Sequence, residues 1–107
     1  MVCEAEISKI RELGRKYSAD AIEFHIKLAE YELDQAIRAA RDGLWERFVS
    51  HVMGVERNMN AVSDTTTWYS LEGRIPGHVA GELYRALIDL HTCTLDALAK
   101  ALEEKCE

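Results

Sequence analysis

Apolar residues recur every three or four positions along most of this chain of 107 residues. This spacing is typical of α-helices, because it places the apolar side chains along one side of the helix. The clearest run predicts a helix of about five turns that ends before Ser63. It consists of Trp45, Phe48, Val52, Val55, Met59 and Val62. Pro76 stands where proline begins helices, so the last helix is predicted to extend from Pro76 to about Lys105.

The first 42 residues carry two neighbouring apolar stripes with the same helical spacing. One stripe is Ile7, Ile10, Tyr17, Ala21, Phe24, Leu28 and Tyr31. The other is Ile22, Ile26, Ala29, Leu33, Ile37 and Ala40. The spacing leaves open whether residues 3–42 form one long helix or two helices broken between Gly14 and Asp20. Gly43 suits the end of this region, because glycine often terminates helices.

Turn-forming residues are scarce, with one proline and six glycines. A sheet protein of this length normally needs more of them. The sequence therefore predicts an all-α fold, an up-and-down helical bundle of three long helices plus an N-terminal helical segment. This bundle of about four helices forms a single domain over residues 1–107.

The last predicted helix is apolar over more of its circumference than a small bundle requires. One seam holds Val79, Leu83, Leu87, Leu90, Ala97 and Ala101, and a second holds Tyr84, Ile88, His91, Leu95, Leu98 and Leu102. A helix in a monomeric bundle buries one stripe about 100° wide, so the surplus requires a partner surface. We expect a second copy of the chain, in a homodimer or higher oligomer. The leading functional hypothesis is a non-enzymatic, self-associating interaction module.

The segment from Ser63 to Ile75 loses the helical period at Thr65, Thr66 and Thr67, which favour extended structure. It is predicted to be a long loop carrying Trp68 and Tyr69. Long loops are often functional, and aromatic side chains commonly anchor interfaces. The two rings either bind a partner or fold back over the core. The predicted interface comprises Tyr84, Ile88, His91, Leu95, Trp68 and Tyr69.

The formal net charge is −6, and no third of the chain is positively charged. The basic surface that dominates nucleic-acid affinity is therefore missing, which argues against DNA as a partner. No apolar stretch reaches the length of a membrane span, and no signal peptide is visible, so we expect no membrane association and a cytoplasmic location. The single glutamine and two asparagines suggest a heat-adapted source.

The three cysteines, Cys3, Cys93 and Cys106, have the spacing of neither a zinc site nor a secreted disulfide framework. On one helix Cys93 and Cys106 would lie roughly 20 Å apart, too far for a disulfide within a chain. Cys3 could pair with either only if the N-terminal helix lies against the last one. We expect all three to be small hydrophobic residues.

Two stretches resemble HEPN-type domains, which are small and often dimeric helical bundles. One runs from Leu28 to Ala36, with Gly43 shortly after it. The other, Arg85-Ala-Leu-Ile-Asp-Leu-His91, has an arginine and a histidine at the spacing of that family. The resemblance implies, as the alternative function, an RNA-cleaving enzyme or an inactive relative from a toxin–antitoxin or defence system. Arg85 and His91 would then face their copies across the dimer cleft, with the histidine as acid–base catalyst.

Two features depart from the family pattern. The residue after the arginine is usually polar in the family and is Ala86 here. Arg85 and His91 also point about 120° apart on a helix. The alternative interpretation is a surface ion pair of Arg85 with Asp89 and a His91 packed in a core or dimer seam.

Other site chemistry has little support in the sequence. Of the four histidines, only His78, with Glu82, has a partner at the spacing that builds metal sites in bundles, and two ligands do not make a site. No nucleophile elbow and no glycine-rich phosphate loop is present. We therefore expect no metal and no cofactor.

Overall fold

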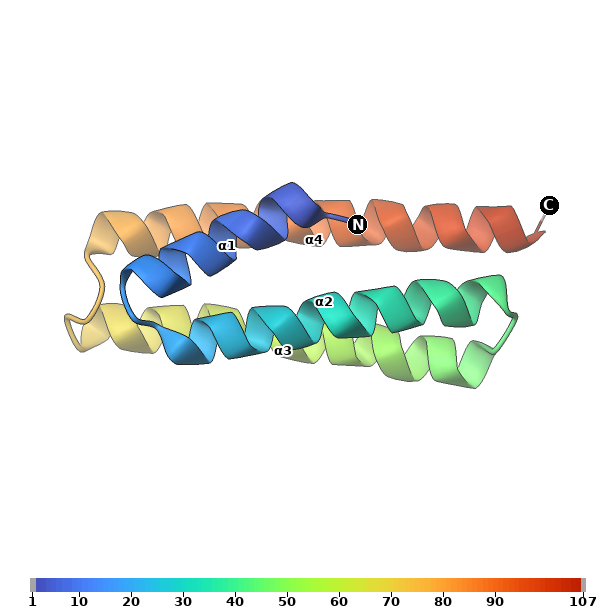
Figure 1. Cartoon of the computed structure of the whole chain (residues 1–107), viewed down its shortest axis with the longest axis horizontal. Coiled ribbons are helices and arrows are strands. Elements are labelled where there is room, and N and C mark those ends of the chain that lie inside the picture. Colours follow the sequence, from blue (N-terminus) through green and yellow to red (C-terminus); the bar gives the residue numbers. More distant parts are fainter. Residues whose placement is uncertain (1, 107) are drawn as a thin grey trace.

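The computed structural model describes residues 2–106, with side chains to residue 105, and consists of four helices. They are α1 (Glu4–Lys16), α2 (Asp20–Arg41), α3 (Trp45–Leu71) and α4 (Gly77–Cys106). Successive helices run in opposite directions, and α1 covers about half the length of α4 (Figure 1). The predicted all-α bundle of three long helices and a shorter N-terminal one is confirmed. No helix within the described part of the chain is long and apolar enough to span a membrane.

The N-terminal region forms two helices, which settles the question left open by the sequence. The break is at residues 17–19, where Ser18 has a φ of 53°. Gly14 of α1 lies close to α2, because a Cβ atom on Gly14 would stand 3.1 Å from the Cγ atom of Glu23. The ion pair between Arg15 and Glu23, at 3.6 Å, joins the two helices across the turn.

The prediction that the third helix ends before Ser63 and is followed by a loop to Ile75 is wrong. Helix α3 continues to Leu71, and only residues 72–76 connect it to α4. Thr66 is fully buried and donates its hydroxyl hydrogen to the carbonyl oxygen of Val62, at 2.7 Å. Because this bond satisfies the hydroxyl inside the helix, threonine can occupy a core position without an unpaired polar group. The buried stripe then continues through Tyr69.

The core lies where α2 meets the other three helices. The second stripe predicted for the N-terminal region, from Ile22 to Ala40, is buried, and so is most of the first seam of α4. The largest fully buried apolar side chains are Ile7, Ile10, Ile22, Ile26, Leu83, Leu90, Val55 and Val62. Each stabilises the fold by about 1.5–3 kcal/mol relative to an exposed position. Phe24 and Tyr31, predicted on an apolar stripe, are instead exposed.

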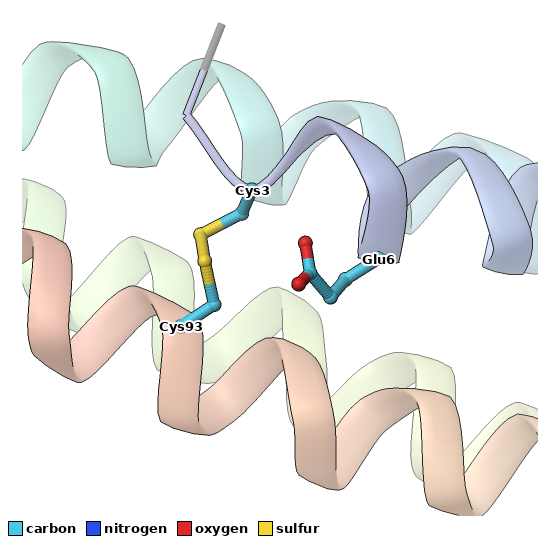
Figure 2. Close-up of side chains that lie close together, drawn as sticks. All are labelled: Cys3, Glu6 and Cys93. Atoms are coloured by element: carbon cyan, nitrogen blue, oxygen red, sulfur yellow. A yellow bond between two sulfur atoms is a disulfide. The ribbon is translucent and has the colours of Figure 1, made fainter.

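The prediction that all three cysteines are simple hydrophobic residues is wrong for two of them. Cys3 and Cys93 form a disulfide, with their Cα atoms 6.0 Å apart. This pairing is possible because α1 lies against α4, so that the start of α1 reaches the middle of α4 (Figure 2). The side chain of Cys106 lies outside the described residues.

Candidate functional site

A hollow of about 370 Å³ lies between α3 and α4. Its lining comes from four residues of α3 and five of α4, and it is mainly apolar with a few polar groups. The lining residues are Glu56, Met59, Asn60, Ser63, Tyr84, Leu87, Ile88, His91 and Thr92. Three of the residues predicted at an interface, Tyr84, Ile88 and His91, thus come together in one place.

His91 pairs with a carboxylate in this hollow. Its Nε2 atom lies 3.4 Å from Oε1 of Glu56, and the two side chains are 46% and 47% exposed. Packing of His91 in a dimer seam stays a prediction, but the interpretation that it packs in the core of the chain is wrong. The reason is that α3 leaves the outer edge of the second seam of α4 uncovered. An accessible imidazole beside a carboxylate can exchange protons with a bound molecule.

A second polar contact sets the relative position of the two helices. The hydroxyls of Thr67 and Tyr84 are hydrogen-bonded across the groove. Together with the Glu56–His91 pair, this contact fixes an antiparallel register, in agreement with the directions of α3 and α4 in Figure 1. In this register Val52 lies level with Leu95, four residues beyond each member of the Glu56–His91 pair.

Exposed apolar side chains extend the hollow along both helices. On α4 they are Ile88, which is 65% exposed, and Leu95, which is 50% exposed. On α3, Trp45, Val49 and Met53 are exposed and precede Glu56 at intervals of three or four residues, so they continue the same side of the helix. We call this surface the α3–α4 face. It comprises Trp45, Val49, Met53, Glu56, Asn60, Ser63, Tyr84, Ile88, His91 and Leu95.

The shape of the molecule explains why this face is open. The radius of gyration is 14.5 Å, whereas a compact domain of this length has about 13 Å. The molecule is long and thin, measuring 49 × 20 × 16 Å. Helix α1 packs on α2 and α4 and does not contact α3. No helix of the described chain therefore covers the groove between α3 and α4.

Arg85 does not approach His91 within one chain. It is exposed, and its guanidinium lies back along α4, with Nη2 3.9 Å from the position of a Cβ on Gly81. The predicted ion pair with Asp89 is not formed either, because none of the ion pairs among the described side chains involves Arg85. Arg85 and His91 thus occupy different sides of α4, as their angular separation predicts.

The two aromatic residues expected in a loop lie instead in the last turns of α3. Trp68 is exposed. Tyr69 is buried, and the guanidinium of Arg74 lies 3.9 Å from the centre of its ring. Tyr69 therefore caps the core, and only Trp68 is available to a partner.

The structure also places a polar cluster, not predicted from the sequence, between α2 and α3. Nδ1 of His51 lies 2.6 Å from Oε2 of Glu32, and Nδ1 of His25 lies 3.2 Å from Oδ1 of Asn58. Gly54 makes room for Glu32, since a Cβ there would stand 2.6 Å from the Cδ atom of Glu32. These contacts join residues that are 33 and 19 positions apart in the sequence, so local spacing could not reveal them. They hold the α2–α3 pair in one alignment.

Comparison with known proteins gives no assignment. The chain matches no protein-family model, no curated protein and no solved structure. Any function must therefore be argued from the α3–α4 face and the other features of the chain itself.

Proposed function

We propose that this protein is a non-enzymatic interaction module that self-associates through the α3–α4 face. The observation that supports this proposal is the set of exposed apolar side chains on two neighbouring helices, Trp45, Val49 and Met53 of α3 and Ile88 and Leu95 of α4. Large exposed apolar patches are uncommon on monomers and mark interaction sites. A cytoplasmic location belongs to the same proposal.

The low charge of the α3–α4 face permits a second copy of the chain as the partner. Two copies with a net charge of −6 each repel one another, so they associate best through surfaces without charge. The α3–α4 face carries one carboxylate, Glu56, and that group is next to His91. A two-fold interface brings the same surface of both subunits together, so the apolar ridges of one copy would cover those of the other.

The test is the oligomeric state of wild type and of an Ile88→Ser variant, measured by analytical ultracentrifugation across a concentration series. Burial of the exposed two-thirds of Ile88 in both subunits contributes about 3 kcal/mol, so the dissociation constant should rise roughly a hundredfold. Phe24→Ser is the matched control, because Phe24 is 58% exposed but belongs to α2. A monomeric wild type, or equal weakening by both substitutions, would contradict the proposal.

A second candidate function, RNA cleavage of the HEPN type, is favoured by one observation. His91 is accessible in a hollow rather than buried among leucines. In a dimer formed through the α3–α4 face, the two copies of His91 would lie on the shared surface. Incubation of mixed RNA with wild type and with His91→Ala tests this candidate, and cleavage by wild type alone would support it. If the dimer does not cleave RNA, this candidate is rejected and the interaction module remains the proposed function.

A further inference from the structure

The disulfide of Cys3 and Cys93 lies beside a carboxylate. The sulfur atoms of both cysteines and a carboxylate oxygen of Glu6 all lie within 4.8 Å of one another. Figure 2 shows the side chain of Glu6 directed toward the disulfide. Cys3 immediately precedes α1, and Glu6 lies in the first turn of that helix. The N-terminal end of α1 and the middle of α4 thus bring the sulfur atoms of two cysteines and a carboxylate oxygen close together.

The surroundings of this cluster are acidic. A surface hollow of about 460 Å³ is lined by Glu6, Asp89, Thr92, Cys93 and Asp96. Among the side chains of residues 2–105, no lysine, arginine or histidine forms an ion pair with any of these three carboxylates. The three carboxylates, none of them in such an ion pair, give the hollow negative charge, which favours a bound cation.

We propose that reduction of the disulfide creates a zinc site whose ligands are the thiolates of Cys3 and Cys93 and the carboxylate of Glu6. Thiolate ligands select zinc over magnesium and calcium. Tetrahedral coordination with zinc–sulfur bonds of about 2.3 Å requires sulfur atoms about 3.8 Å apart. With the Cα atoms 6.0 Å apart, rotation of the cysteine side chains about χ1 opens this distance while the backbone stays in place. A water molecule occupies the fourth position.

The chemistry has two steps. A dithiol reductant transfers two electrons and two protons to the S–S bond, which gives two thiols and leaves the reductant as a disulfide. Zinc then binds both sulfur atoms and displaces their two protons into solvent. The metal replaces the broken covalent link, so α1 remains attached to α4 in reducing surroundings as well.

Cobalt(II) is a spectroscopic probe of such a site, and the experiment uses the full chain with Cys106→Ser so that only Cys3 and Cys93 supply thiols. After reduction, one equivalent of cobalt should produce thiolate-to-cobalt charge-transfer bands and the intense visible bands of tetrahedral coordination. Cobalt binding should release two protons per chain, and zinc should then displace the cobalt without further proton release. The oxidised protein should bind neither metal at this site.

Glu6→Gln tests the carboxylate while both cysteines are retained. It should weaken zinc binding by the reduced protein at least about tenfold. Glu12→Gln, an exposed position on the same helix, should have no effect. If the reduced protein loses helix signal in circular dichroism, equimolar zinc should restore it. The proposal is overturned if the reduced protein binds no metal, if zinc fails to restore a lost fold, or if Glu6→Gln and Glu12→Gln behave alike.

Discussion

Removal of the disulfide should destabilise the protein as strongly as the loss of a large core side chain. Cys3 and Cys93 are separated by 90 residues, so their bond closes a loop over most of the chain. In the chain-entropy description, a loop of this size stabilises the folded state by about 4.6 kcal/mol at 25 °C. The unfolding entropy of a domain of 107 residues is about 0.22 kcal/mol per kelvin, so the melting temperature should fall by about 20 °C.

The variant for this measurement is Cys3→Ser with Cys93→Ser, and Cys106→Ser alone is the control. Urea unfolding followed by circular dichroism gives the free energy of unfolding, and a thermal scan gives the melting temperature. Wild type treated with a reductant, in the presence of a chelator, should behave like the double variant. If wild type, reduced wild type and the double variant unfold at the same urea concentration, the bond does not constrain the unfolded chain and the reasoning is refuted.

Four substitutions test the packing of the long helices by urea unfolding. Gly81→Ala should stabilise the protein by about 1 kcal/mol, because alanine favours helix and the Cβ meets only the end of the Arg85 side chain. Gly54→Ala should instead reduce the free energy of unfolding by about 1 kcal/mol, because the new Cβ displaces Glu32 from His51. Equal effects at both glycines would contradict the close contact between Gly54 and Glu32. Thr66→Val should change stability by less than about 1 kcal/mol, whereas Thr66→Asp should cost about 3 kcal/mol or more. Tolerance of Thr66→Asp would place residue 66 outside the core.

Helix α4 was predictable because its signals agree. Pro76 marks its start, the apolar seam that begins at Val79 is interrupted only at Thr94, and the structure begins the helix at Gly77. The end of α3 was not predictable in this way, because the β-branched residues at 65–67 favour strands by propensity. The helical period nevertheless continues there, since Thr66 is four residues after Val62 and three before Tyr69. A threonine that bonds its own helix fills an apolar position, and composition does not reveal this.

The candidate face was predictable only in part. Sequence spacing correctly placed Tyr84, Ile88, His91 and Leu95 on one stripe, because that property depends on a single helix. Whether this stripe is buried depends on where α1 packs, and α1 covers the opposite flank of α4. The same dependence explains the disulfide of Cys3, whose partner is set by helix packing rather than by spacing.

Because α1 is shorter than the other helices, one half of the molecule has four helices and the other half has three. From the disulfide toward the α3–α4 turn, four helices are present and the chain is crosslinked; beyond Cys93, only α2, α3 and α4 remain (Figure 1). Amide hydrogens in the four-helix half should exchange with deuterium mainly through global unfolding. Those near the α2–α3 turn and in the last turns of α4 should exchange through partial opening, at a lower free energy. Partial unfolding of the bundle should therefore begin only at the end that contains the α2–α3 turn.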